Sequence, residues 1–152
     1  GYTYYRLMAG KIFGDIPYPL MFIPVGNENV YFNSEAYQLM NAFEFAADEY
    51  AAFWLEHHFD GAIFNRIPLV RKLNLRSLVS AKALIGNAKD SNLDFIALPD
   101  GMRVPENWYV EVGFGIENIL QLLRVDFYWR ATQRDVPDIQ KFGIKIAIGP
   151  KL

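Results

Sequence analysis

The sequence predicts an all-β fold, an antiparallel meander of about six long strands. Apolar and polar side chains alternate with a period of two in several segments, as expected for strands with one apolar and one polar face. Clusters of Gly, Pro, Asn and Asp separate these segments and indicate loops. Aromatic residues make up 16% of the 152-residue chain, led by 12 Phe and 9 Tyr. That fraction is high for a soluble domain and typical of a membrane barrel with interfacial aromatic girdles.

Composition narrows the classes of protein that need to be considered. The length fits one domain, and we interpret residues 1–152 as a single β-barrel segment. A formal charge of −2 gives no electrostatic reason to expect nucleic-acid binding. Cysteine is absent, which excludes a disulfide framework and a thiolate metal site. No run of about 18 apolar residues exists, so a transmembrane helix is not expected. The chain opens on a strand-like segment without a signal peptide, so we expect a fragment of a longer barrel protein.

The alternation and the loop residues together place the elements. Strands are predicted at residues 2–13, 43–60, 74–87, 108–117, 123–132 and 141–149. The connections are then 14–38, 61–73, 88–106, 118–122 and 133–140, with one helical turn expected after Pro68. Short turns on one side and longer loops on the other are typical of outer-membrane barrels. We therefore expect 61–73 and 118–122 on the periplasmic side and the other connections on the extracellular side.

The pair of strands around residues 118–122 gives the clearest register. Folding the hairpin so that both faces match sets Glu117 opposite Arg124 and Glu111 opposite Arg130 on the polar face. The same register sets Val112 opposite Trp129 and Phe114 opposite Phe127 on the apolar face. Such cross-strand pairs contribute roughly 0.2–1 kcal/mol each. A slip of one residue would move the charges onto the apolar face, so the register is predicted to be firm.

The alternation fits two architectures, a membrane barrel and a soluble antiparallel sheet or barrel whose apolar face is turned inward. Three features favour the membrane barrel: a polar face with balanced charges, a continuous apolar face of large side chains, and the alternating connection lengths. The predicted lumen-facing polar network comprises Asp48, Glu56, His58, Arg76, Lys82, Glu111, Glu117, Arg124, Asp126, Arg130 and Lys145. The predicted lipid-facing residues are Phe53, Leu55, Val112, Phe114, Phe127, Trp129, Ile144 and Ile146.

Several motifs in order resemble one protein family. They include Gly-Asp-Ile-Pro-Tyr-Pro-Leu at 14–20, Leu-Met-Asn-Ala-Phe-Glu-Phe at 39–45, Asp-Glu-Tyr at 48–50 and Leu-Glu-His-His-Phe-Asp-Gly at 55–61. Further motifs are Asn-Arg-Ile-Pro-Leu-Val-Arg-Lys-Leu at 65–73, Glu-Val-Gly-Phe-Gly-Ile-Glu-Asn-Ile at 111–119 and Leu-Arg-Val-Asp at 123–126. The set resembles the C-terminal barrel of the uncharacterised outer-membrane proteins of Bacteroidota that carry an N-terminal carboxypeptidase-regulatory-like domain. The resemblance implies an outer-membrane barrel at the C-terminal end of a larger polypeptide, and it carries no established activity over to this chain.

Candidate chemistry centres on the sequence Glu56-His57-His58 with Asp60. Adjacent residues of a strand point to opposite faces, so the two histidines are not expected to bind one ion. Glu56, His58 and Asp60 share a face, and a cation held by them is the less favoured interpretation. The inward carboxylates are expected to neutralise the inward cations rather than to catalyse. Ser80 lacks a nucleophile elbow. Arg66, Arg71 and Lys72 form a basic cluster, for which a solvated turn is the favoured interpretation and contact with lipid head groups or a periplasmic partner is the alternative.

These observations predict the wall of an outer-membrane β-barrel in a Gram-negative bacterium, with a transport, assembly or structural role, no catalysis and no cofactor. The expected partners are the lipid bilayer and the remaining strands of the same barrel or other outer-membrane subunits; nucleic acid is not expected. Two alternatives remain. One is a soluble β-barrel that binds a hydrophobic ligand, and the other is a metal-dependent enzyme that uses Glu56, His58 and Asp60.

Overall fold

The computed structural model describes residues 1–95 and 97–149, and its main element is one six-stranded antiparallel sheet. The strands are β1 (Tyr2–Lys11), β2 (Glu49–Asp60), β3 (Arg76–Asn87), β4 (Tyr109–Ile119), β5 (Leu123–Arg130) and β6 (Phe142–Ile148). Their order in the sheet is the order in the sequence, so every strand pairs with its neighbour in the chain. The predicted all-β antiparallel meander of six strands is confirmed.

The register of the β4–β5 hairpin agrees with the pattern of its side chains. Glu111 lies opposite Arg130, Val112 opposite Trp129 and Phe114 opposite Phe127, which confirms three of the four predicted pairs. The fourth pair, Glu117 with Arg124, falls in an irregularity of the ladder between Ile116 and Ile119. Asn118 and the turn residues Leu120 and Gln121 all have positive φ, which tightens the turn and ends the regular pairing early.

The sheet is open in the described part of the chain, because β1 and β6 do not pair with each other. The two edges differ. At the β6 edge the chain around Tyr31 forms a parallel bridge: the Phe32 amide donates to the Ile146 carbonyl and the Ile146 amide donates to the Val30 carbonyl, both at 2.8 Å. Among the described residues, β1 pairs only with β2 along its whole length. The outer edge of β1 is therefore free for a further strand.

The long strand predicted over 43–60 is wrong in its first third. β2 begins at Glu49, and Phe43 takes a left-handed backbone conformation with φ of 58°. Between them Phe45 bridges to Arg103 and Ala47 bridges to Phe22, so this stretch pairs with loops rather than with β1. Residues 44–48 are all buried, so their exposure does not alternate. The sequence alternates in polarity on both sides of Glu49, so the pattern does not show that the strand begins only there.

In the ranges that the structure describes, the connections contain four short helices, of which the sequence predicted only the turn after Pro68. The segment 88–106, predicted as a loop, includes helix α1 (Asp90–Phe95). The 3₁₀ turns are η1 (Tyr18–Leu20), η2 (Phe64–Arg66) and η3 (Arg71–Leu73), the last of which follows Pro68 as expected. No helix in the described part of the chain has both the length and the apolar character that crossing a membrane requires.

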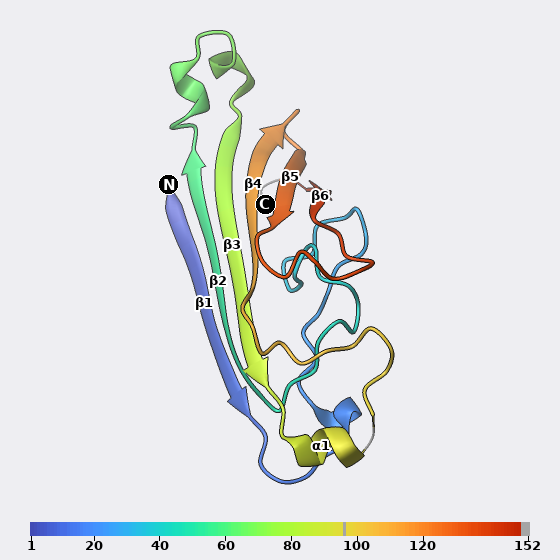
Figure 1. Cartoon of the computed structure of the whole chain (residues 1–152). Coiled ribbons are helices and arrows are strands. Elements are labelled where there is room, and N and C mark those ends of the chain that lie inside the picture. The colour runs from blue at the N-terminus through green and yellow to red at the C-terminus, as the bar shows by residue number, and fades with distance from the viewer. Residues whose placement is uncertain (96, 150–152) are drawn as a thin grey trace.

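The molecule has two layers, as Figure 1 shows: the sheet, and irregular chain lying on one of its faces. We call this the inner face, and we call residues 12–48 the covering segment. The core lies between the layers, where Tyr37, Met40, Phe45, Ala52, Leu84 and Tyr109 pack together. A second cluster joins Met21 and Ala46 to Ala88 and Met102 in the β3–β4 connection. Both clusters form beneath loops, on the inner side of the sheet.

The opposite, outer face carries large apolar side chains that the chain leaves uncovered. Leu7 is 74% exposed and Trp129 is 44% exposed. Other exposed members are Phe53, Val79, Val112, Phe142, Ile144 and Ile148. Along β4 and β5 burial alternates residue by residue, with every inner position from Tyr109 to Glu117 and from Arg124 to Arg130 buried. The sheet is therefore apolar outside and charged inside, the reverse of an ordinary soluble sheet.

Candidate functional site

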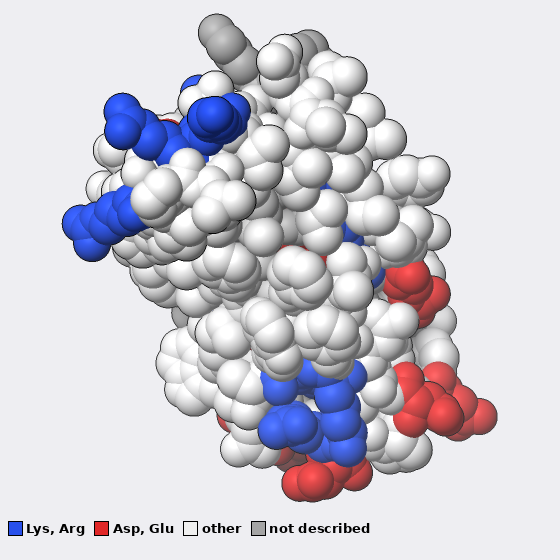
Figure 2. Space-filling model, turned by 90° about the horizontal axis from the view of Figure 1, so that it is seen from above, with Lys and Arg blue, Asp and Glu red and all other residues white. Residues whose placement is uncertain are grey.

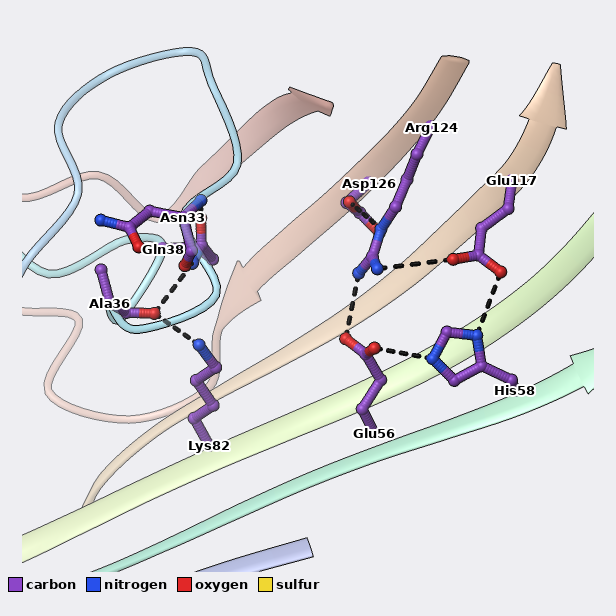
Figure 3. A network of polar contacts seen from close by, with 9 residues as sticks. All are labelled: Asn33, Ala36, Gln38, Glu56, His58, Lys82, Glu117, Arg124 and Asp126. Atoms are coloured by element: carbon purple, nitrogen blue, oxygen red, sulfur yellow. Dashed lines mark hydrogen bonds and ion pairs between the residues drawn. The ribbon is translucent and has the colours of Figure 1, made fainter. Parts of the chain in front are cut away.

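Charged side chains gather on the inner face beneath the covering segment. The alternation of the strands places them there, because residues two apart on one strand share a face. β2 supplies Glu56 and His58, β4 supplies Glu117, and β5 supplies Arg124 and Asp126. These five side chains form one network near the β4–β5 turn, seen on the right of Figure 3. We call it the ion cluster.

His58 lies at one end of the ion cluster between two carboxylates. Its Nε2 is 2.7 Å from Glu56 Oε1, and its Nδ1 is 3.0 Å from Glu117 Oε2. A carboxylate only accepts hydrogen bonds, so both ring nitrogens must donate and the imidazole is cationic in this geometry. The ring of Tyr2 stacks on the His58 ring, with centroids 4.3 Å apart. His58 therefore has no free nitrogen to offer to a metal ion or a substrate.

Arg124 completes the network. Its Nε donates to Asp126 Oδ2 at 2.7 Å and its Nη2 donates to Glu56 Oε2 at 3.0 Å. Its Nη1 reaches Glu117 Oε1 at 3.5 Å, so the predicted contact between these side chains exists despite the irregular ladder. The ring of Phe32, from the covering segment, lies 4.3 Å from the guanidinium carbon. One arginine thus connects three carboxylates from three strands, an arrangement that offsets part of their negative charge where the groups are largely buried.

A second set of inner side chains holds the covering segment by its backbone. Glu111 accepts hydrogen bonds from the amides of Gln38 at 2.7 Å and Leu39 at 2.9 Å. Lys82 donates to the carbonyl of Ala36, as seen on the left of Figure 3. Its Nζ also lies 4.0 Å from the centre of the Trp54 ring. These side chains thus provide hydrogen-bond partners for buried backbone groups of the covering segment that do not pair with a neighbouring strand.

Glu44 is the main ionic anchor of the covering segment. Its carboxylate receives Arg130 Nη1 at 3.1 Å and Nη2 at 2.6 Å, and Arg103 Nη2 at 2.5 Å. It also accepts the Asn41 amide at 3.0 Å. Burial alone would raise the pKa of Glu44, but the hydrogen bonds from Arg130, Asn41 and Arg103 hold that pKa below its ordinary value. The covering segment is therefore joined to β5 and to the β3–β4 connection at a single carboxylate.

Two further contacts tie the covering segment down. Lys145 donates to the carbonyls of Asn27 at 2.8 Å and Asn29 at 2.5 Å, so the cation of β6 fixes the chain that bridges to the β6 edge. The phenol of Tyr37 donates to the Ala83 carbonyl at 3.4 Å. Burial raises the pKa of Tyr37 to about 12, so it stays a neutral donor. Each strand from β3 to β6 thus contributes a side chain that hydrogen-bonds to the covering segment.

Gly113 and Gly115 make room for the inner side chains of neighbouring strands. A Cβ on Gly113 would lie 2.6 Å from the Tyr128 ring, and one on Gly115 would collide with the Asp126 carboxylate. Neighbouring side chains thus leave no room for a Cβ at either position, which accounts for glycine there. Ser80 Oγ lies beside Gly113 and Asp126 Oδ1 beside Gly115, and neither atom has a hydrogen-bond partner in the described chain.

The structure brings most, but not all, of the predicted lumen-facing residues together. Asp48 is buried but precedes β2, and it accepts the Lys89 amide and the Asn92 side chain, both at 2.8 Å, instead of joining a strand network. Arg76 is exposed and makes no ion pair with a described residue. The eight predicted lipid-facing residues all lie on the outer face, and their contact with lipid stays a prediction.

The three residues considered for a metal are not gathered as ligands. Glu56 and His58 bond to each other and to the ion cluster, whereas the Asp60 carboxylate lies 2.9 Å from the Gly1 amine. A register shift between His58 and Asp60 separates the two positions. Among residues 1–95 and 97–149 no group of three or more His, Cys, Asp and Glu side chains is placed to hold a metal ion.

Sequence reasoning missed the partners that come from irregular chain. Gln38, Asn27 and Arg103 all make buried or half-buried contacts on the inner face, yet they lie in segments without periodicity. The one signal in the sequence is the aromatic and aliphatic content of residues 14–38 (Tyr18, Met21, Phe22, Tyr31 and Phe32), which is unusual for a solvated loop. It gave no means of pairing particular loop residues with particular strands.

The fold and the site define an open antiparallel sheet whose charged face is buried under its own chain and whose apolar face is exposed. Residues 2–97 match the model of the family described as "Family of unknown function (DUF5686) C-terminal domain", and the chain belongs to this family. The match supports the predicted assignment to the C-terminal region of an uncharacterised family. No curated protein and no solved structure matches the chain significantly. The Bacteroidota origin and the N-terminal regulatory-like domain remain predictions.

Proposed function

We propose that this chain forms part of the wall of an outer-membrane β-barrel, with a transport, assembly or structural role and no catalytic one. The reversed polarity of the sheet carries the proposal: the outer face is apolar and uncovered, while the charged inner face is buried. Apolar surface costs roughly 25 cal/mol per Å² in water, and soluble monomers rarely expose more than a few hundred Å² of it in one patch. A bilayer removes that cost, because lipid tails cover such a face.

The free edge of β1 favours the proposal that this sheet is part of a larger barrel. An edge strand with unpaired amides and carbonyls is not tolerated in a hydrocarbon interior, so a membrane sheet must close. Further strands that add to β1, from the same polypeptide or from another outer-membrane subunit, would satisfy that requirement. The bridge of the covering segment to β6 occupies part of the other edge. These observations favour extension at the β1 side.

The covering segment favours an occluded barrel over an open diffusion pore. It lies against the inner face and is bound there by Glu111, Lys82, Glu44 and Lys145 through charge-assisted hydrogen bonds. Such bonds are about twice as strong as neutral ones. Transport through this region would need the segment to leave or shift. An assembly or structural role needs no such movement.

The alternatives find less support. A soluble barrel for a hydrophobic ligand requires an apolar interior, whereas the face covered by the chain's own segment is the charged one. A metal-dependent enzyme at Glu56, His58 and Asp60 requires three converging ligands, and both His58 nitrogens are already paired with carboxylates. Neither alternative explains the exposed outer face.

The direct test places single cysteines in a full-length, otherwise cysteine-free protein expressed in a Gram-negative host. Val112→Cys and Trp129→Cys report the outer face, and Ala131→Cys, just beyond β5, reports exposed chain. With nitroxide labels in outer-membrane preparations, the outer-face sites should be accessible to oxygen and protected from a water-soluble nickel complex, whereas position 131 should be accessible to nickel. Equal nickel access at all three sites would refute the membrane proposal.

A further inference from the structure

A cavity lies at the end of the sheet where β2 leads into β3 and β4 turns into β5. It has a volume of about 720 Å³, within the usual range for ligand sites. Its lining comes from the β2–β3 connection (Lys72, Leu73, Asn74, Leu75), the start of β3 (Arg76), the β4–β5 turn (Ile116 to Arg124) and Gly149. One wall reaches the ion cluster through Glu117 and Arg124. The opposite wall reaches the outer face through Ile116 and Leu123.

The connection beside this cavity is strongly basic. Residues 61–76 contain Arg66, Arg71, Lys72 and Arg76 and no Asp or Glu, and all four basic residues are exposed. None of the four forms an ion pair with a residue in the described ranges. Lys72 and Arg76 line the cavity itself. Figure 2 views the molecule from above, the end that carries this connection in Figure 1, and shows two groups of basic side chains; the group at the upper left has little acidic surface beside it, whereas the lower group lies next to acidic side chains.

The same end of the molecule exposes leucines. Leu69 is 89% exposed, Leu120 is 86% exposed, and Leu73 and Leu122 are also uncovered. Leu120 sits at the tip of the β4–β5 turn with φ of 51°, a conformation that Gly or Asn would adopt at lower cost. Turn tips in water are usually polar. The surface around the cavity therefore combines unpaired cations with exposed aliphatic side chains.

We infer that this cavity binds the phosphodiester headgroup of an anionic phospholipid from the adjacent leaflet, an inference that rests on the proposed membrane function. Lys72 and Arg76 would receive the phosphate, and Leu73, Leu120 and Leu122 would contact the upper acyl chains. Ile116 and Leu123 connect the cavity to the apolar outer face, where the chains would continue. A zwitterionic headgroup fits less well, because Glu117, the carboxylate that lines the cavity, is already paired with His58 and Arg124.

The test uses the full-length protein in vesicles of phosphatidylcholine alone or of phosphatidylcholine mixed equally with phosphatidylglycerol. The variant is Lys72→Gln with Arg76→Gln. The matched control is Arg134→Gln with Lys141→Gln, which removes one exposed arginine and one exposed lysine at the opposite end of the sheet. Affinity for a fluorescently labelled phosphatidylglycerol is measured at several salt concentrations, from the quenching of the protein's Trp fluorescence by the labelled lipid. Two basic residues near an anionic surface contribute about thirtyfold in affinity, so the variant should bind about thirtyfold more weakly and lose salt dependence.

Soluble glycerol phosphate, added as a competitor, separates a lipid from a free phosphate ester. It should fail to displace the lipid, because it lacks the chains that contact the leucines. Displacement at concentrations equal to the lipid would overturn the lipid assignment, as would an unchanged preference in the double variant or an equal loss in the control. Insertion is read separately, by the shift of the folded band on heating before electrophoresis. Protein that inserts without preferring phosphatidylglycerol refutes only this inference, whereas protein that does not insert refutes the proposed function.

Discussion

Breaking the pair of Glu44 with Arg130 should release the covering segment from the sheet. The pair is bidentate, with distances of 3.1 and 2.6 Å, and the side chains of Arg130 and Glu44 are 0% and 3% exposed. Removing one partner of a buried pair typically costs about 3–5 kcal/mol, because the other charge is left desolvated. Glu44 also holds Arg103, which is partly exposed and can regain water. We therefore expect Glu44→Gln or Arg130→Met to cost about 3 kcal/mol each.

The double-mutant cycle isolates the interaction. The double variant leaves neither charge alone, so its loss should fall short of the sum of the single losses by about 2–3 kcal/mol. The assay is hydrogen exchange of the amides between 36 and 48 in the full-length protein in detergent, which reports release of the segment without complete unfolding. The cycle measures coupling only if each single variant keeps its strands, which strand amide protection verifies.

The chain contains a matched control for this cycle. Arg6 and Glu35 also form a two-bond pair, at 2.6 and 3.1 Å, and Glu35 also belongs to the covering segment. These side chains are 48% and 63% exposed, so their coupling should be only about 0–1 kcal/mol. Equal coupling in the two cycles would refute the reasoning, because burial would then not be what makes the Glu44 pair strong. So would an absence of coupling between Glu44 and Arg130.

Three further predictions follow from other contacts. Acid should loosen the covering segment. In the folded chain the pKa of Glu44 lies below its ordinary value of 4.5. The ion pairs of Glu44 therefore contribute their full stability above pH 4.5, and that stability is lost as the pH falls through the folded pKa. Protection factors at residues 36–48, which correct for the intrinsic pH dependence of amide exchange, should fall on acidification in the native protein and much less in Glu44→Gln. Equal changes of the protection factors with pH in the two proteins would contradict this. Gly113→Ala should cost about 1–3 kcal/mol in denaturant unfolding because its Cβ meets the Tyr128 ring, whereas Gly101→Ala, which meets no atom, should cost only the strain of its φ of 88°. Val112→Lys on the outer face should cost about 2–4 kcal/mol in a bilayer, against a few tenths at an exposed soluble position, and a near-neutral result in lipid would argue against the membrane wall.

The strands were predictable because their signal is local. In β4 and β5 each residue reports its face through its polarity, and the matching faces leave one register that places Glu111 opposite Arg130. That pairing, however, does not make an ion pair. Glu111 binds the amides of Gln38 and Leu39, and Arg130 binds Glu44, so both charges serve the covering segment rather than each other. Alternation predicts which face a side chain occupies and not which partner it selects there.

The predictions that failed all concern irregular segments, in which neighbouring residues do not alternate between a buried and an exposed face. Residues 43–48 continue the alternation of β2 by composition, but the positive φ at Phe43 and the pairing of Ala47 with Phe22 belong to a loop packed from both sides. Helix α1 is only six residues long, too short for a 3.6-residue period to stand out. The covering segment lacks any period, so its buried contacts depend on tertiary packing alone.

The buried charges therefore have two structural consequences that an apolar inner face would not provide. A slip of β5 by one residue along β4 would carry Arg124, Asp126 and Arg130 to the outer face, where the proposed bilayer would leave them unpaired. The penalty for that error is far larger than for exchanging one aliphatic residue with another, so the charges select the register. The charges of the inner face then require donors and acceptors on that side, and the backbone of the covering segment supplies them at Ala36, Gln38 and Leu39. Selection of the register and retention of the covering segment thus depend on one set of side chains, which links correct pairing of the strands to coverage of the inner face.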